Sequence, residues 1–523
     1  MDKLRIGKSI VVFMLILVVI IIPVIKNQSD KSEVVVSPSS KEFVFKEIKP
    51  NEEMEKQLIE NNAGLEEQIN KVLKDARLEG TTTSISIRNA ADGKILYTNL
   101  GDTRVHPASL MKLLTGAAAL ETLGLEHAFK TELYTDGKIK NGELQGNLYI
   151  KGLGDPTLTK DDLILFATEL KEKGIHSIAG NLFGDDTWYD DDRLSQDLNW
   201  SDEPYYSGAQ VSALTLSPND DFDAGTVIVD VYPAAKSGEA GSIRMVPENS
   251  YIKIVNKTKT VAKNGTSYIK AERVHGSNTV IVSGTVPLGL KQNRSWASVW
   301  EPTNYTLNVF KHVLDEQGIE FTDVTQIGTG KVPSGASLLA TNQSIPLKEI
   351  LTPFMKLSNN GHGEVLVKEI GRVIGDKGSW DKGLEVMNKT LADIGMDMNT
   401  ILLRDGSGMS HKTLVTANEV TNLLFIAQTK PWYDDFVNSL PVAGIEERFV
   451  GGTLRYRMNG TAAEGKVKAK TGTLNGVSSL AGYAETKDGE TLIFSAIINN
   501  HLDDTAYGLL DELAVIIANY QRD

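Results

Sequence analysis

The sequence predicts an α+β fold in which one domain is split by a long, mainly β insertion. Helical patterns dominate near the N-terminus and again from residue 347, whereas 129–339 consists mostly of short Val, Ile, Thr and Tyr runs separated by Gly, Asn and Asp. The chain then returns to strands and a last helix. Separate runs of helices and strands are typical of α+β proteins. We therefore expect 56–132 and 334–523 to form one domain and 133–333 to form the insertion.

The first part of the split domain is predicted to contain two helices and a hairpin. An amphipathic helix over 58–73 precedes two strands, 83–88 and 94–99, whose connection ends in Gly93. The next helix, 107–120, is apolar on almost every face. A helix of that kind is buried, so we expect this one at the centre of its domain.

The insertion is predicted to hold strands and a single helix near 161–173. Its clearest strands cover 226–232, 251–255, 268–274 and 279–286. After the insertion, helical patterns cover 347–357, 364–374, 380–394, 417–428 and 439–443. The last strands are predicted at 466–471, 478–485 and 491–499, and the last helix at 505–522.

Composition limits the classes of function. The chain has 523 residues, 54 basic and 68 acidic side chains, a net charge of −14 and no cysteine. Net acidity argues against nucleic acid as a partner, because binding it requires a basic surface. The lack of cysteine excludes disulfides, thiol catalysis and thiolate metal sites. We expect neither a cofactor nor a metal.

The N-terminus has the pattern of an export segment. Three basic residues within the first eight positions precede an apolar run, 10–25. A helix of that length rises about 24 Å, a little less than the roughly 30 Å hydrocarbon core. Since no A-x-A-like cleavage site follows, we expect 1–25 to be an uncleaved anchor, 26–55 a linker, and the rest to lie outside the cytoplasm. Cleavage, and thus secretion, is the alternative.

A Ser-x-x-Lys tetrad, Ser109 to Lys112, opens the buried helix. Positions i and i+3 share a helix face, so the hydroxyl and the amine are within hydrogen-bond reach. In an apolar setting the ammonium form is disfavoured, and a neutral lysine serves as a base towards serine. Such a tetrad also arises by chance, and two further copies start at Ser250 and Ser267. Those copies lie in strand-like runs, where i and i+3 point to opposite faces.

Two weaker motifs follow along the chain. Ser358-Asn359-Asn360 lies between two predicted helices, and Lys470-Thr471-Gly472-Thr473 ends a predicted strand. A glycine between Lys and Thr lets a substrate backbone approach the strand closely. Taken singly, each motif is equally compatible with an ordinary loop or strand end.

In this order and context the three motifs are those of penicillin-binding proteins and β-lactamases. The chain resembles the D-alanyl-D-alanine carboxypeptidase/endopeptidase family, the class C low-molecular-mass penicillin-binding proteins with a large insertion. About 245 residues separate the first motif from the second, which distinguishes it from class A β-lactamases and small carboxypeptidases. The resemblance covers roughly 56–520 and extends to segments that include Gly152–Leu158, Arg404–Gly408 and Ser439–Gly444. One departure is an extra stretch, 446–451, after Ile445.

The resemblance implies a serine β-lactamase/DD-peptidase-like fold with a central antiparallel sheet, and a set of site residues. The implied catalytic residues are Ser109, Lys112, Ser358, Asn360 and Lys470. Ser109 attacks, Lys112 takes its proton, Ser358 bridges the two lysines, and Asn360 holds the substrate's amide. The implied substrate-binding residues are Thr471, Gly472, Thr473, Leu474 and Asp202, with Asp202 and Leu474 in a pocket for a diaminopimelate amine. A solvated surface position is the alternative for Asp202.

The implied substrates are peptidoglycan stem peptides, and the implied covalent inhibitors are β-lactam antibiotics. An acylated sensor or wall-binding protein without turnover is an alternative function. A β-lactamase is disfavoured, because no deacylating glutamate can be placed by motif. The acidic residues Asp185, Asp186 and 190–192 lack the pattern of a calcium loop, so we expect a solvated turn there.

Overall fold

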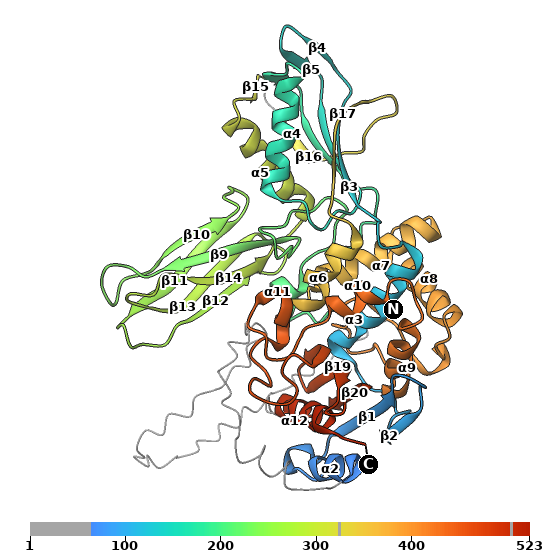
Figure 1. Cartoon of the computed structure of the whole chain (residues 1–523). Helices are drawn as coiled ribbons and strands as arrows, with labels where there is room; N and C mark the ends of the chain where they lie inside the picture. Colours follow the sequence, from blue (N-terminus) through green and yellow to red (C-terminus); the bar gives the residue numbers. More distant parts are fainter. Residues whose placement is uncertain (1–63, 323–325, 503–505, 523) are drawn as a thin grey trace, which may run out of the picture. The chain divides into compact units, whose positions relative to one another are not determined.

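The computed structural model describes residues 64–322, 326–502 and 506–522 (Figure 1). The predicted anchor and linker lie outside these residues. Within them, no helix combines the length and the apolar character needed to cross a membrane. The α+β class is confirmed, with a central antiparallel sheet, helices on both of its faces and an inserted region.

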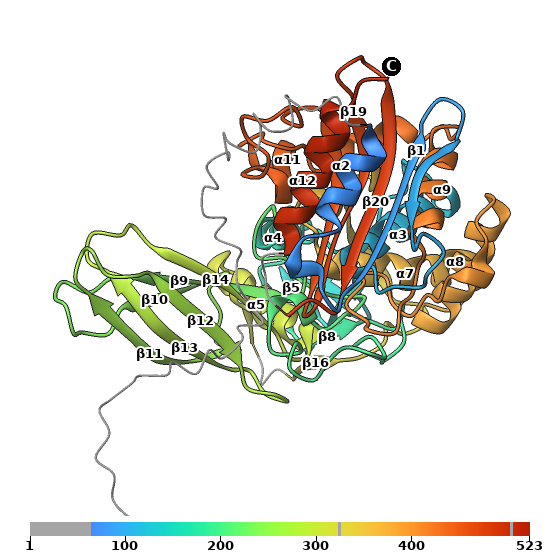
Figure 2. The same cartoon turned by 90° about the horizontal axis from the view of Figure 1, so that it is seen from below.

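The central sheet joins the two ends of the described chain. Its strands run in the order β18-β19-β20-β1-β2, and all pairs are antiparallel. The strands are β1 (Thr82–Asn89), β2 (Ile95–Asn99), β18 (Val467–Leu474), β19 (Val477–Glu485) and β20 (Thr491–Asn499). Alternate residues of β20 face opposite cores, Phe494 on one side and Ile493 on the other. Helices α2 (Leu65–Val72) and α12 (Ala506–Asn519) cover the first of these faces (Figure 2).

The other face of the sheet is covered by a helical core around α3 (Met111–Thr122). A 3₁₀ turn, Ala108–Leu110, precedes α3, and ten of the helix's twelve residues are buried. The predicted central helix is thus confirmed. The helices packed with it are α6 (Leu347–Lys356), α7 (Asn360–Gly375), α8 (Trp380–Asp393), α9 (Ala417–Ala427) and α10 (Tyr433–Ser439). Short turns complete this part: α11 (Arg448–Gly451) and 3₁₀ turns at Ala76–Leu78, Met398–Thr400 and Gly452–Leu454.

The helix predicted over 439–443 is wrong. The helix α10 ends at Ser439, and Leu440 adopts an extended conformation. The cause is Pro441, since a proline disfavours the helical conformation of the residue before it. Val442 then forms a bridge with Lys468 beside the central sheet.

The described residues of the inserted region form four sheets and two helices, whereas the sequence predicted strands and a single helix. Helix α4 (Lys160–Glu172) is the predicted one, and α5 (Pro302–Glu316) was not foreseen. The strands before α5 are β3 (Lys130–Thr135), β4 (Lys138–Lys140), β5 (Glu143–Gln145), β6 (Leu148–Gly152), β7 (Ser177–Ala179), β8 (Leu182–Asp185), β9 (Thr226–Tyr232), β10 (Ser242–Val246), β11 (Lys253–Val261), β12 (Tyr268–Arg273), β13 (Thr279–Pro287) and β14 (Asn293–Ser298). After it come β15 (Glu320–Phe321), β16 (Ile327–Thr329) and β17 (Ser337–Gln343), and a 3₁₀ turn lies at Tyr206–Gly208. One apolar core joins these elements.

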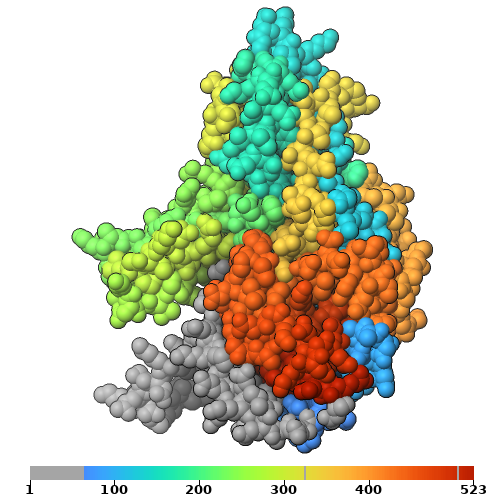
Figure 3. Space-filling view, in the orientation of Figure 1, coloured from blue at the N-terminus to red at the C-terminus, as the bar shows by residue number. Residues whose placement is uncertain are grey.

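The chain enters and leaves the insertion on neighbouring strands. Strand β17 pairs antiparallel with β3, with Gln343 opposite Lys130. In Figure 3 the yellow surface of the returning segment lies beside the cyan surface of the entering one. The chain therefore enters and leaves the insertion at one place, just before α6 begins.

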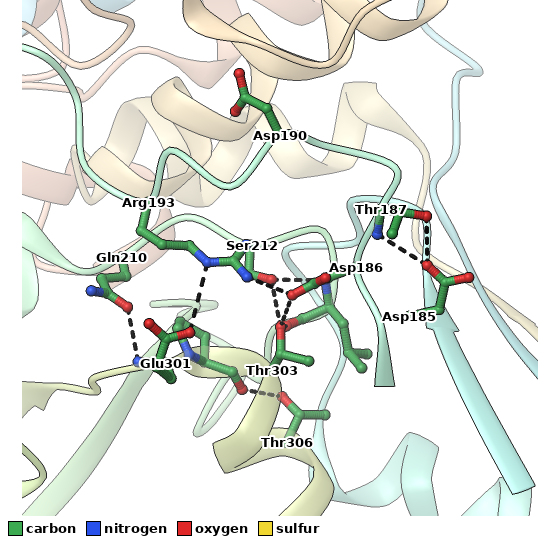
Figure 4. Close-up of polar contacts among 12 residues, drawn as sticks. Asp185, Asp186, Thr187, Asp190, Arg193, Gln210, Ser212, Glu301, Thr303 and Thr306 are labelled. Carbon is green, nitrogen blue, oxygen red and sulfur yellow. Dashed lines mark hydrogen bonds and ion pairs between the residues drawn. The ribbon is translucent and has the colours of Figure 1, made fainter. Parts of the chain in front are cut away.

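The acidic segment 185–192 is only in part the solvated turn that we expected, because Asp191 and Asp192 are its only exposed acidic residues. Asp185 and Asp186 are buried, and Asp186 pairs with Arg193 at 2.6 Å and accepts a hydrogen bond from Thr303 (Figure 4). Asp190 pairs with Lys368 of α7 at 2.6 Å. The segment thus fastens the insertion to the helical core. In the described part of the chain no cluster of three or more His, Asp or Glu side chains could hold a metal.

Helices α7 and α8 cross at a contact that only glycine allows. A Cβ on Gly383 would lie 1.9 Å from the carbonyl oxygen of Val367. We expect Gly383→Ala to lower the free energy of unfolding by about 1–3 kcal/mol, because the backbones must separate. Gly328→Ala in β16 is the matched control, since nothing lies within 4 Å of its added Cβ. Urea unfolding measures both, and equal stability of the two variants would contradict the assignment.

Candidate active site

Ser109 and Lys112 lie on one face at the start of α3. The Lys112 Nζ is 2.9 Å from the Ser109 Oγ, as the spacing predicted. The preceding residue, Ala108, has a positive φ of 48° and packs against Gly408, where a Cβ would come within 1.9 Å of the Ala108 carbonyl. The other two Ser-x-x-Lys copies do not couple. Ser250 bonds to Asn308, and Lys270 pairs with Glu272.

Lys112 is fully buried and has three acceptors. Its Nζ donates to the Ser109 hydroxyl, to Asn360 Oδ1 at 2.7 Å and to the Ser407 carbonyl at 2.8 Å. Burial lowers the pKa of Lys112 to about 7, although Asp405 and Glu364 favour its charged form. A neutral amine has two N–H groups and a lone pair. With three partners, two accept the N–H groups of the neutral amine and the third faces its lone pair. Ser109 is the only one of the three that has a proton to donate to that lone pair.

Lys470 lies on β18 and contacts a second serine, Ser358, from the loop before α7. Its Nζ donates to Ser358 Oγ at 2.9 Å and to the Thr471 carbonyl at 2.7 Å. Burial, reinforced by the charge of Lys112, holds the pKa of Lys470 well below its usual value. Ser358 has a positive φ of 60° and directly precedes Asn359, which caps α7. The loop that carries the second motif is therefore fixed by the start of this helix.

The predicted bridge from Ser358 to both lysines is only half present. Ser358 contacts Lys470, whereas Lys112 is contacted by Asn360. The other end of the Asn360 amide donates to the Ser207 carbonyl of the insertion at 2.9 Å. Asn360 thus ties Lys112 to the insertion in this structure, rather than presenting a free amide to a substrate.

The strand β18 approaches the Ser109 turn at Gly472. A Cβ there would lie 2.8 Å from the Pro107 carbonyl and 2.9 Å from the Ser109 nitrogen. Ser479, opposite Gly472 on β19, donates to the same Pro107 carbonyl at 2.8 Å. The structure therefore places the Ser109 backbone N–H beside the strand that continues into Thr473, which is exposed. Thr471 is hydrogen-bonded to Thr453 at 2.8 Å.

Asp202 and Leu474 stand apart from these lysines. Leu474 is the last residue of β18 and lies opposite Val477. Asp202 accepts a hydrogen bond from Asn199 at 3.3 Å, and burial raises its pKa while His411 opposes the rise. In the described part of the chain, no hydrogen bond joins Asp202 to the five predicted catalytic side chains. The structure brings Ser109, Lys112 and Asn360 together and pairs Ser358 with Lys470. Among the described residues, Asp202 and Leu474 are not hydrogen-bonded to either group.

Sequence reasoning missed several residues that are distant from Lys112 in the chain but surround it in the structure. Ser407 supplies a carbonyl, Ser207 anchors Asn360, and the buried carboxylates of Glu364 and Asp405 lie nearby. A small hollow beside them is lined by residues that include Leu198, Ser207, Asn360, Glu364, Ser407 and Met409. The glycines around Ser407, at 406 and 408, were the one signal of a tightly packed loop.

This arrangement can be compared with known proteins. The family of D-Ala-D-Ala carboxypeptidase 3 (S13) matches residues 65–520. The chain belongs to this family. The predicted family is confirmed, and with it the class of enzyme, a serine-type DD-peptidase.

Relatives and solved structures agree with this assignment. A D-alanyl-D-alanine carboxypeptidase of Actinomadura sp. (strain R39) is 41% identical over 460 residues, covering 87% of this chain and 85% of that protein. D-alanyl-D-alanine carboxypeptidase DacB of Haemophilus influenzae is 27% identical over 429 residues, covering 81% of this chain and 86% of that protein. The crystal structure of penicillin binding protein 4 (dacB) from the same organism matches with a TM-score of 0.72 and 26% identity, covering 85% and 97%. A structure of that protein with a β-lactam matches with a TM-score of 0.67 and 25% identity, covering 85% and 98%.

Proposed function

We propose that the enzyme cleaves D-alanyl-D-alanine in peptidoglycan stem peptides through an acyl-enzyme on Ser109. The observation that carries this proposal is the buried Lys112, 2.9 Å from the Ser109 hydroxyl and with its pKa lowered to about 7. A lysine in that state accepts a proton near neutral pH, which is what a serine nucleophile needs.

Acylation then follows from the geometry. The Ser109 Oγ bonds to the carbonyl carbon of the penultimate D-alanine, and its proton passes to Lys112. The oxyanion lies between the backbone N–H groups of Ser109 and Thr473. The close approach of Gly472 to the Ser109 nitrogen supports this placement. The C–N bond breaks as the leaving amine takes a proton from Ser358, which Lys470 replaces. The proton that Lys112 took from Ser109 then passes to Lys470, so Lys112 is neutral again. In the second half-reaction Lys112 takes a proton from the attacking water and returns it to the Ser109 oxygen as the ester bond breaks.

The substrate's terminal carboxylate is bound at β18. Lys470 is surrounded by protein and its ammonium form is disfavoured in the free enzyme. An arriving carboxylate favours the charged form, because an opposite charge offsets the cost of burial. The hydroxyls of Thr471 and Thr473 supply further donors. A β-lactam offers a strained amide and a carboxylate in the same relation, so it would acylate Ser109 and leave slowly.

Ser109→Ala should abolish both labelling by fluorescent penicillin and release of D-alanine from a stem pentapeptide. The matched controls are Ser250→Ala and Ser267→Ala, which alter the other two Ser-x-x-Lys copies on exposed positions. Both controls should label at the wild-type rate. Labelling that survives in Ser109→Ala would refute the nucleophile. Labelling without D-alanine release in the wild type would instead indicate a sensor.

The acylation rate should depend on pH through Lys112. Because burial lowers the pKa of this lysine to about 7, its neutral fraction grows as the pH rises through 7. We expect the second-order rate constant with penicillin to rise about tenfold per pH unit below 7 and to level off above it. Stopped-flow labelling between pH 5 and 9 measures this. A profile that levels off only near pH 10 would contradict a neutral lysine.

Asp202 is proposed to bind the amine of a diamino acid in the stem peptide. Its carboxyl is half-buried and its pKa is raised by burial, so a bound ammonium would offset the cost of its charge. Asp202→Asn should raise KM for a peptide with a diaminopimelate residue about 10-fold, and leave KM unchanged for the same peptide with norleucine there. Equal effects on both peptides would exclude the specific pairing.

We propose that the catalytic part works outside the cytoplasm, held at the membrane by 1–25 or released after cleavage. The basic flank and apolar run of the sequence support this placement. Fractionation of cells that express the full chain tests it, and recovery of unprocessed protein in the cytosol would refute it. Whether carboxypeptidase or endopeptidase activity dominates is decided by comparing a pentapeptide with a cross-linked dimer as substrate.

A further inference from the structure

We propose that Glu364 is a positioning residue: its carboxylate holds the Gly406–Ser407 backbone so that the Ser407 carbonyl anchors Lys112 beside Ser109. This inference rests on the proposed function of Lys112 and adds a residue that no motif marks. Glu364 touches neither the serine nor the substrate, so its effect passes through the loop that it binds.

Both oxygens of the Glu364 carboxylate accept hydrogen bonds from protein donors. It lies one helical turn after Asn360 on α7 and is buried. Its Oε1 accepts from the Ser407 N–H at 3.0 Å, and its Oε2 accepts from the Gly406 N–H at 3.1 Å and from Trp380 Nε1 at 2.7 Å. No cation is among these partners. The negative charge is therefore stabilised by two consecutive backbone N–H groups and an indole.

The carbonyls of the same two residues, Gly406 and Ser407, are held by α3. The Ser407 carbonyl accepts from Lys112 at 2.8 Å, and the Gly406 carbonyl accepts from Thr115 Oγ1 at 2.8 Å. The loop is thus clamped between α7, which supplies the acceptor, and α3, which supplies two donors. Loss of the Glu364 carboxylate would free one side of the clamp.

Glycines make this clamp tight. A Cβ on Gly406 would lie 2.1 Å from the Gly363 carbonyl, and a Cβ on Gly363 would lie 2.7 Å from the Gly406 carbonyl. The loop therefore rests directly on the backbone of α7. A shift of the loop moves the Ser407 carbonyl, and with it the acceptor of Lys112.

A carboxylate fits this position and an amide does not. Both Glu364 oxygens face N–H donors, so a glutamine would direct its NH₂ group at one of them and lose that hydrogen bond. The charge acts on Lys112 as well. Glu364 and Asp405 favour its ammonium form, against the effect of burial. His362 on α7 is neutral at pH 7, because burial lowers its pKa to about 4. Removing one of the two negative charges lowers the pKa of Lys112.

The test compares Glu364→Gln with Glu369→Gln in the full chain. Glu369 lies on the same helix, is equally buried and accepts from an indole, Trp188 Nε1, at 2.9 Å. Its other partners are Tyr189, which donates at 2.9 Å, and His127, whose Nε2 lies 3.2 Å from Oε1. None of these partners belongs to the 405–408 loop. It therefore reports the general cost of replacing a buried glutamate on α7.

The readout is single-turnover acylation by fluorescent penicillin as a function of concentration and pH. For Glu364→Gln we expect the limiting rate on the alkaline plateau to fall roughly 10- to 100-fold, the saturation constant to stay unchanged, and the acidic limb to move to lower pH. Glu369→Gln should keep the wild-type limiting rate and limb. A folded Glu364→Gln enzyme with a wild-type plateau and limb would overturn the proposal, as would equal losses in both variants.

A second variant covers the case in which Glu364→Gln does not fold. Trp380→Phe keeps the buried ring and removes one donor from Oε2. It should lower the limiting rate in the same direction by a smaller factor, and a wild-type rate would overturn the proposal. Ser109→Ala separates the two levels of inference. If it still labels, the proposed function fails, whereas a dead Ser109→Ala beside a fully active Glu364→Gln refutes only the role of Glu364.

Discussion

The burial of one amine, that of Lys112, is the constraint on which the rest of the site depends. An ammonium in an apolar core is costly unless its hydrogen bonds are satisfied. Here the three acceptors come from three different parts of the chain: the serine one turn earlier, the start of α7 and the loop after α8. The helical core must therefore be assembled before the lysine acquires its lowered pKa. Catalytic competence is in this sense a property of tertiary packing.

The insertion takes part in that packing and is not merely attached to it. The Ser207 carbonyl fixes the amide of Asn360, and Phe222, in a loop with a positive φ of 56°, offers its carbonyl to Asn359 and His362. Asp221 of the same loop pairs with Arg448 at 2.8 Å. Arg448 belongs to the extra stretch, 446–451, in which the sequence departs from its family's pattern. That departure thus adds a further ion pair between the insertion and the rest of the fold.

Local rules predicted what local interactions decide. The pair Ser109 and Lys112 follows from helical spacing, and the faces of β20 follow from a period of two. Helix α5 was not predicted, because its β-branched and aromatic residues are typical of strands. Pro302 at its first turn is a helix-start signal that favoured the correct assignment. The partners of Lys112 and the burial of Asp185 and Asp186 depend on contacts between distant segments. In the sequence, a run of acidic residues is typical of a solvated turn. The burial of Asp186 becomes evident only when the fold brings Arg193 and Thr303 to it.

The pairing of β1 with β20 governs the order in which the molecule is built. Thr82 lies opposite Asn499, so the central sheet cannot close until almost the whole chain has left the ribosome. The insertion has its own apolar core and joins the rest through neighbouring strands, so it can fold while the first strands still wait for their partners. Until β18–β20 arrive, β1 has an unpaired edge and the apolar α3 has no sheet to cover it. The nascent chain therefore exposes an aggregation-prone edge for most of its synthesis, and the candidate active site, which needs β18, cannot form before that strand is made.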